Sequence, residues 1–276
     1  MSVRTPAIVT TSLALPGAVV FCMFFLLPLS VVLIEATSDG GSAFSRVWSD
    51  PVFWNGLQGS ILLGIAAPCI SMLVGVPVAI TLARLTPRMR TSLLIAISLP
   101  LTFSGLIIAY GFILLLGRAG FVTLLLAKVG FDPAIVGGFI FSPLGLGLAY
   151  SYYLVPRVVL IVLPAVRNFD IVQLRAARSL GAGPLRTLTD VLLPQIISSL
   201  VAAFCLTSAV AVGAYGTSLA LVGTQVNILP LILYSKVSET GTDLPSAAVI
   251  SIVLMAICGC IIAVGEAAFS RSQHRR

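Results

Sequence analysis

The sequence is poor in charged residues. Asp, Glu, Lys and Arg together occupy only 9% of the 276 positions, whereas 58% of the positions are hydrophobic. Soluble globular domains contain about 25% charged residues, which they need to cover a surface that faces water. The composition therefore excludes a soluble protein and indicates that lipid is the solvent for most of the chain.

The residue patterns of an enzyme are also missing. The single histidine, His274, lies in a basic C-terminal tail, and neither Lys128 nor Lys236 belongs to a glycine-rich phosphate-binding loop. No paired carboxylates and no serine-centred elbow occur where a site could form. We therefore expect no catalytic residue and no cofactor, and any ATP that drives this protein must be hydrolysed by another chain.

Cysteine is scarce and confined to apolar surroundings, where it packs as a small hydrophobic residue. The positions therefore predict neither a disulfide framework nor a metal site. The five cysteines are Cys22, Cys69, Cys205, Cys258 and Cys260.

Long apolar runs make up most of the chain. A helix needs roughly 20 apolar residues to cross the hydrocarbon, and the runs are continuous, without the alternation of a membrane barrel. The first run is too long for the core of a signal peptide, so we expect it to be a retained span. The fold class is all-α, a polytopic membrane protein with one domain over residues 1–276 and spans at about 8–34, 57–82, 93–116, 139–163, 196–222 and 247–264.

The basic residues predict the orientation of these spans. Six spans put both termini on one side, and positive residues gather on the cytoplasmic side of membrane proteins. We therefore expect cytoplasmic termini. Since the basic residues lie beside span ends rather than in one stripe, the net charge of +7 reflects topology and not nucleic-acid binding. The eleven on the side of the termini are Arg4, Arg84, Arg88, Arg90, Arg167, Arg175, Arg178, Arg186, Arg271, Arg275 and Arg276.

Three connections are longer than a turn requires. Residues 35–56 are polar and external. Residues 118–138 contain an apolar stretch, 121–129, that is too short to span and is expected to lie at the outer interface or to fold back partly into the membrane. Residues 165–193 form a cytoplasmic loop.

This cytoplasmic loop predicts a helix, a glycine turn and a second helix. Asp170 can cap a short helix through Ser179, and Gly181 can end it in the left-handed conformation. Pro184 suits the first turn of a second short helix that runs to about residue 192, before Pro194 opens the fifth span. The residues alone leave two interpretations open: a surface that docks another protein, or an amphipathic loop on the lipid surface.

The same loop resembles the signature of the permease subunits of bacterial ABC importers with the MetI-like fold. In that family EAA is followed by a glycine four residues on and by a hydrophobic stretch that ends in Leu-Pro. This chain has Ala176 and Ala177, Gly181 at the expected offset, and Leu193-Pro194. Arg175 stands where the family usually has glutamate. The similarity of charge pattern and span count extends over nearly the whole chain.

The resemblance implies a function and a set of partners. The loop would be the coupling loop that docks on a cytoplasmic ATPase subunit. Its coupling residues would be Arg175, Ala176, Ala177, Gly181, Leu193 and Pro194. The other partners would be a second permease subunit, identical or related, and an external solute-binding protein, in a bacterial inner membrane. Within the family, spacing and residues 215–234 look most like permeases for polyamines, ferric iron, thiamine or aminoethylphosphonate.

Few polar residues within the spans could line a translocation path. Arg157 is the one charge well within a span, and it could line a cavity, pair with a neighbour or reach back to the interface. Hydroxyls in the fourth and fifth spans could line a path, although in membranes they commonly bond helices together. The candidate path residues are Arg157, Tyr150, Thr207, Ser208 and Tyr215.

Two other classes of function remain at this point. A passive channel or membrane scaffold would need no ATP, and its loop would bind some other cytoplasmic protein. An ion-coupled carrier usually buries an acidic group within its spans, but here all nine acids lie in loops or at the end of the last span.

Overall fold

The computed structural model describes residues 15–169, 171–223, 226–238 and 243–273, and of residues 171, 174, 175, 178, 184, 185 and 268–273 it describes the backbone alone. Within these residues every regular element is a helix, and six helical stretches are long and apolar enough to cross a membrane. This confirms the predicted all-α polytopic fold. The expected start of the first span at residue 8 lies outside the described residues, where the first stretch runs over Leu15–Thr37.

The elements follow one another in two groups. The first group contains a π-helix η1 (Cys22–Leu26), α2 (Leu27–Thr37), α3 (Ser42–Ser49), α4 (Pro51–Arg84), α5 (Pro87–Ser98), a 3₁₀ turn η2 (Leu99–Thr102), α6 (Gly105–Leu116), α7 (Phe121–Ala127), α8 (Pro133–Gly138) and a 3₁₀ turn η3 (Phe139–Phe141). The second contains α9 (Pro143–Arg167), α10 (Ile171–Ser179), α11 (Pro184–Thr187), a π-helix η4 (Leu188–Leu192), α12 (Leu193–Val212), α13 (Gly216–Val222), α14 (Leu229–Ser238) and α15 (Leu244–Gln273).

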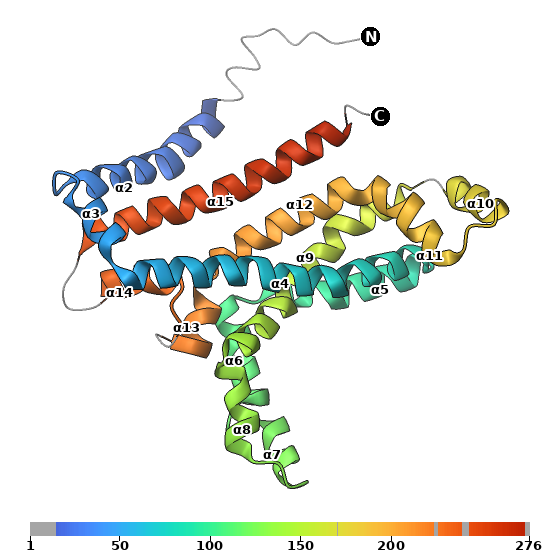
Figure 1. Cartoon of the computed structure of the whole chain (residues 1–276), viewed down its shortest axis with the longest axis horizontal. Coiled ribbons are helices and arrows are strands. Elements are labelled where there is room, and N and C mark those ends of the chain that lie inside the picture. Colours follow the sequence, from blue (N-terminus) through green and yellow to red (C-terminus); the bar gives the residue numbers. More distant parts are fainter. Residues whose placement is uncertain (1–14, 170, 224–225, 239–242, 274–276) are drawn as a thin grey trace.

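Long helices form a bundle in which α4 packs along α9 and α12, while α15 packs on α12 and α2 (Figure 1). Small residues let these helices approach closely. A Cβ atom added to Gly75 of α4 would lie 2.8 Å from Val158 Cγ1 of α9, and one added to Gly64 would lie 2.5 Å from Val212 Cγ2 of α12. Close helix approach through small residues is the usual way in which membrane helices gain packing energy.

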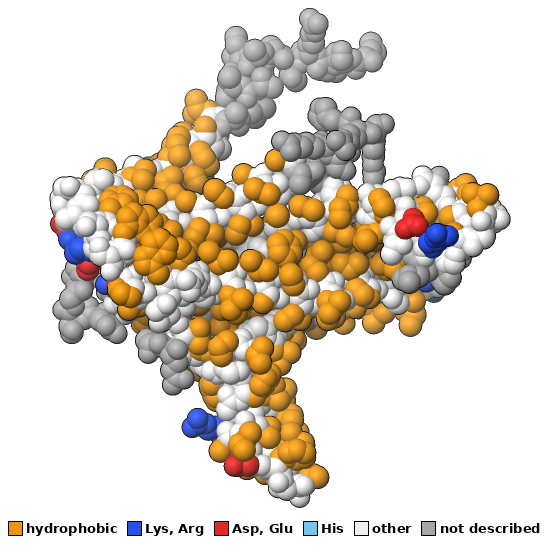
Figure 2. All heavy atoms as spheres, viewed as in Figure 1, with side chains coloured by type: hydrophobic (Ala, Val, Ile, Leu, Met, Phe, Trp, Pro, Cys, Tyr) orange, Lys and Arg blue, Asp and Glu red, His pale blue; other side chains and the backbone are white. Residues whose placement is uncertain are grey.

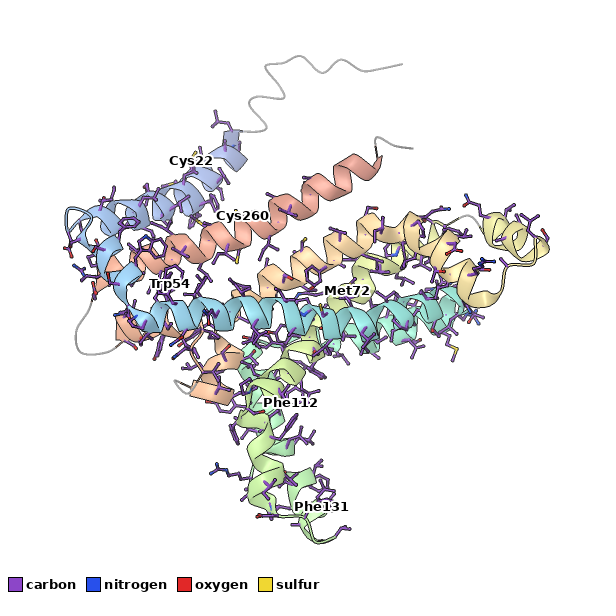
Figure 3. All side chains as sticks on the ribbon, viewed as in Figure 1. Cys22, Trp54, Met72, Phe112, Phe131 and Cys260 are labelled. Atoms are coloured by element: carbon purple, nitrogen blue, oxygen red, sulfur yellow. The ribbon has the colours of Figure 1, made fainter. Side chains whose placement is uncertain are left out.

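An arm made of α6, α7 and α8 projects away from the long helices (Figure 1). Phe112 lies near the base of this arm, where its ring meets Tyr152 of α9 edge to face at 5.5 Å, and Phe131 lies near its tip (Figure 3). Helix α7 occupies residues 121–127 of the apolar stretch at 121–129.

Charged side chains on the visible face gather at the two ends of the long helices and near the tip of the arm, while the rest of that face is mainly apolar (Figure 2). At the end that holds α3 and α14, Arg46 bridges Asp39 at 2.9 Å and Asp243 at 3.1 Å. Burial raises the pKa of Asp243, but hydrogen bonds from Ser246 and the charge of Arg46 outweigh it, so the net pKa lies below its ordinary value. This end is thus held together by ion pairs outside the apolar zone.

The predicted third span, 93–116, is not one helix. It is divided among α5, η2 and α6, and α6 turns away into the arm. Pro100 in η2 has no N–H for a helical hydrogen bond, and Ser104 caps a new helix by accepting from Ile107 N at 3.4 Å. The sequence did not predict this interruption because the apolar run continues through it.

The predicted fifth span, 196–222, is also wrong as one helix. Helix α12 ends at Val212, and α13 starts at Gly216. At its other end, α12 begins earlier than expected because the second loop helix does not stop near residue 192: α11, η4 and α12 are continuous. The ring of Pro194 displaces the carbonyl of Asp190, and the helix accommodates it by widening into the π-helix η4.

Candidate functional site

The tip of the loop at residues 165–193 has the predicted glycine turn. Gly181 has φ +83°, and beyond α10 the N–H of Ala182 donates to the carbonyl of Ala177 at 3.0 Å. A hydrogen bond from an N–H to the carbonyl five residues earlier, with a left-handed glycine between them, is the Schellman motif that ends a helix. Pro184 then begins α11, as the sequence predicted, whereas the expected cap Asp170 lies outside the described residues.

The base of this loop is fixed to the bundle. Phe169 is only 8% exposed and packs in a cluster with Leu192 and Ile196. Thr187 is 2% exposed, and its hydroxyl donates to the carbonyl of Gly183 at 2.9 Å. A buried base under a short, tight turn makes the loop a defined projection.

The tip, in contrast, has little covering it. Leu180 is 88% exposed, Ala176 is exposed, and no atom lies within 4 Å of a Cβ added at Gly181 or Gly183. The structure therefore brings Ala176, Ala177 and Gly181 together at one surface. Leu193 and Pro194 lie apart from this surface at the start of α12, and the side chain of Arg175 is not among those described.

A cavity of about 270 Å³ lies where the two broken spans meet α9. One wall is η2 with the start of α6, and another is the interruption between α12 and α13. Gly105 makes this approach possible, because a Cβ there would lie 2.4 Å from Thr217 Oγ1. The lining residues are Pro100, Leu101, Phe103, Gly105, Ile108, Tyr153, Arg157, Val210, Gly213, Ala214, Tyr215, Gly216 and Thr217.

Arg157 lines this cavity. Its Nη1 donates to the carbonyl of Tyr153 at 3.2 Å, and its guanidinium carbon lies 5.5 Å from the centre of the Tyr153 ring. The ion pairs found in the described part of the chain join other residues, and no carboxylate is among the lining residues. Arg157 thus faces this cavity without a counter-charge among the lining residues.

The candidate path residues do not all lie at this cavity. Tyr215 lines the cavity with Arg157. Tyr150 is fully buried, and its hydroxyl donates to the carbonyl of Ala214 at 2.9 Å, so it binds α9 to the interruption between α12 and α13. Thr207 donates at 2.7 Å to a carbonyl of its own helix. Ser208 lines a different, apolar pocket between α4, α12 and α15.

Tyr153 and Thr217 are cavity residues that the sequence did not single out. A pair of helix-start signals could have found the site: Ser104 before Gly105, and the glycines at 213 and 216. Both signals interrupt apolar runs that otherwise favour unbroken spans. The five cysteines are all free, and Cys22 and Cys260 lie on different helices (Figure 3).

Six apolar helices, an anchored loop with an exposed tip and an interior cavity define a multi-pass membrane protein of the transporter class. The chain belongs to the family of binding-protein-dependent transport system inner membrane components, whose family model matches residues 75–270. This confirms the resemblance drawn from the loop at residues 165–193, and the chain is a transmembrane permease subunit of the ABC-importer type.

Curated relatives share about a quarter of their residues with this chain. Sulfate permease 2, chloroplastic, of Chlamydomonas reinhardtii is 27% identical over 84% of this chain and 62% of the relative, so the match spans less than two thirds of that protein. The sulfate transport system permease protein CysW of Synechocystis is 26% identical over 87% of this chain and 86% of the relative. The spermidine/putrescine transport system permease protein PotB of Escherichia coli is 26% identical over 78% of each chain.

Solved structures show the same fold. A chain of a bacterial alginate ABC transporter, in complex with an alginate pentasaccharide-bound periplasmic protein, superposes with a TM-score of 0.74 at 16% identity and covers 93% of this chain and 92% of that one. A second structure of a bacterial alginate importer gives a TM-score of 0.72 at 16% identity, with 95% coverage of both chains.

Proposed function

We propose that this permease imports a small solute and is driven by a separate cytoplasmic ATPase that docks on the loop around Gly181. The observation that carries the proposal is the contrast within this loop, whose base is buried in the bundle while its apolar tip has little cover. A solute delivered by an external binding protein would pass the cavity beside Arg157. ATP hydrolysis belongs to the docked subunits.

The exposed tip favours a protein partner. Leu180 presents most of its side chain, and small residues and glycines around it allow another backbone to come close. Exposed apolar groups bounded by polar ones mark protein or membrane contacts. Arg186 and Asp190 flank this tip with exposed side chains, which form a loose pair at 3.9 Å. We favour an ATPase over a lipid surface because the family to which the chain belongs has the same alanine-glycine turn.

The loop lies at the end of the bundle where the basic residues cluster. Arg90 donates from Nη2 to the carbonyl of Leu85 at 2.8 Å and from Nε to that of Leu82 at 3.0 Å, so it caps the end of α4. With the positive-inside rule, this arrangement supports a cytoplasmic loop and cytoplasmic termini. The remaining parts of the proposed assembly are a second permease subunit, identical or related, and a bacterial inner membrane.

Co-purification tests the docking proposal. Gly181→Trp adds bulk at the tip and strains the left-handed backbone, so we expect it to abolish recovery of the ATPase from detergent-solubilised native membranes. Gly130→Trp is the matched control, because Gly130 has φ +98° and equally open surroundings but lies in the turn between α7 and α8. It should retain the ATPase.

Leu180→Asp removes the apolar tip without backbone strain and should also reduce ATPase recovery, by about tenfold if docking loses about 1.4 kcal/mol. Membrane insertion, checked by recovery in the carbonate-washed membrane fraction, and the gel-filtration profile in detergent should be unchanged in all three variants. If the wild type carries no ATPase, a channel or scaffold becomes the better explanation. Normal ATPase recovery with both Gly181→Trp and Leu180→Asp would place the docking surface elsewhere.

A further inference from the structure

We propose that the cavity between η2, α6, α9, α12 and α13 binds an oxyanion group of the solute in transit, through the Arg157 guanidinium, the Tyr153 hydroxyl and the first turn of α6. This inference rests on the import function proposed above and names its substrate class: a small anion bearing a sulfate, phosphate, phosphonate or carboxylate group. It assigns the specificity of the permease to charge.

Arg157 gives the cavity a positive charge, which favours an anionic solute. Arg157 projects a cation into an interior space whose described lining contains no acid, and its recorded hydrogen bond goes to a carbonyl of its own helix. A cation removed from water is costly unless it is paired, so such a site favours an anion over a cation or a neutral solute. A cationic solute would meet repulsion from the same guanidinium.

Tyr153 supplies an independent observation. Its side chain lines the cavity beside Arg157 and is only 6% exposed, yet its hydroxyl oxygen has no hydrogen-bond partner. Thr217 lines the same cavity and interacts with this hydroxyl, but no hydrogen bond of normal geometry joins the two side chains. Buried hydroxyls almost always find a partner, so an orphan that faces a cavity indicates a group that arrives from outside. A phenol hydroxyl can donate to an oxyanion.

The start of α6 adds a third donor group. The first N–H groups of a helix have no partner within it, and they carry the positive end of its dipole. The Ser104 hydroxyl accepts from the N–H of Ile107 and its carbonyl from that of Ile108, which leaves the N–H groups of Gly105 and Leu106 at the start of the helix, and Gly105 lines the cavity without a side chain to block it. Helix α6 is 12 residues long, so its dipole is fully developed. Broken helices whose starts face an interior site are a recognised way for transporters to hold anionic groups.

Charge-selective labelling of a cysteine in the cavity tests the inference. Val210→Cys places a thiol on the cavity wall in a background whose five native cysteines are replaced by alanine. The full chain in lipid nanodiscs is treated with a negatively charged sulfonatoethyl or a positively charged trimethylammonioethyl methanethiosulfonate. Each rate is divided by that of the same reagent with free 2-mercaptoethanol.

We expect the anionic reagent to react about tenfold faster than the cationic one, because a focused positive potential raises the local anion concentration at least that much. Arg157→Gln should bring the ratio near one, and Arg157→Lys should retain it. A ratio of one or less in the Val210→Cys parent, or the same ratio in Arg157→Gln as in the parent, would overturn the proposal.

Protection distinguishes a binding site from a mere field. A mixture of sulfate, phosphate and acetate should slow labelling severalfold relative to chloride at matched ionic strength. Tyr153→Phe should lose much of this protection while keeping the charge preference. Protection equal to that by chloride, or unchanged in Tyr153→Phe, contradicts the proposed site. None of these measurements requires an ATPase, so their outcome is separate from that of the docking experiment.

Discussion

The contact between Gly64 and Val212 allows a stringent test of how the bundle is packed. Gly64 lies on the buried face of α4, and Val212 is the last residue of α12, 2% exposed. A Cβ at residue 64 would approach Val212 Cγ2 to 2.5 Å, whereas ordinary contact begins near 3.4 Å. One helix must therefore shift by about 0.9 Å, since a β-branched side chain in a helix has one strongly preferred rotamer.

Gly64→Ala should destabilise the protein by about 1–3 kcal/mol, the usual cost of overpacking. The proper reference is Gly259→Ala on α15, where a Cβ meets no atom within 4 Å and alanine brings only its better helix propensity, about 1 kcal/mol. Val212→Ala alone should cost about 1–2.5 kcal/mol through the small cavity it leaves.

The double substitution should recover much of this loss. With alanine at 212 the clashing methyl is gone, and the next nearest atoms lie 3.8 Å and 3.9 Å from the new Cβ. We expect a favourable coupling of at least about 1 kcal/mol in a double-mutant cycle. Equilibrium unfolding by SDS in mixed micelles, followed by circular dichroism, measures each variant. If Gly64→Ala is as stable as Gly259→Ala, or if the two costs simply add, the helix contact described here is wrong.

Three further predictions concern single side chains. Asp243, whose pKa is lowered in the folded protein, contributes stability that is fully present above the ordinary pKa of about 3.9 and is lost as pH falls through the lower folded value. Thermal scans should therefore show that the loss of stability in Asp243→Asn relative to the wild type shrinks toward zero below about pH 4. A loss of stability that is constant with pH would refute this. Tyr150→Phe should cost about 1–2 kcal/mol in the same SDS assay, because it removes the hydrogen bond that a fully buried side chain makes to Ala214, whereas Tyr152→Phe, at 47% exposure, should cost little. Arg90→Ala should speed proteolysis after residue 84 because it uncaps α4, and exposed Arg88→Ala should leave that rate unchanged.

The elements that could be predicted are those specified by local chemistry. Gly181 tolerates the left-handed conformation that other residues avoid, and the ring of Pro184 fixes φ at a helical value, so their spacing alone predicted a helix, a left-handed turn and a second helix. The apolar runs likewise marked the membrane-crossing helices, because hydropathy is a property of the sequence itself.

The cavity could not be predicted because it depends on contacts between segments that are distant in sequence. Gly105 meets Thr217 across more than a hundred residues, and nothing local indicates that the two interruptions face each other. Hydropathy does not detect a helix that ends and restarts within an apolar run, which is why two spans were predicted as unbroken helices. Arg157 could be recognised as unusual, but its surroundings depend on both breaks.

The continuity of α11, η4 and α12 has a mechanical consequence. From Pro184 beside the exposed tip to Val212 beside the cavity, the backbone is helical throughout, which at about 1.5 Å per residue spans roughly 40 Å. A helix of this kind resists compression, so a push on the tip of the loop is delivered at the far end as a displacement of nearly the same size. Such a displacement would reach the cavity wall at Gly213, and the π-helical turn η4 is a point along the helix where bending would reduce it.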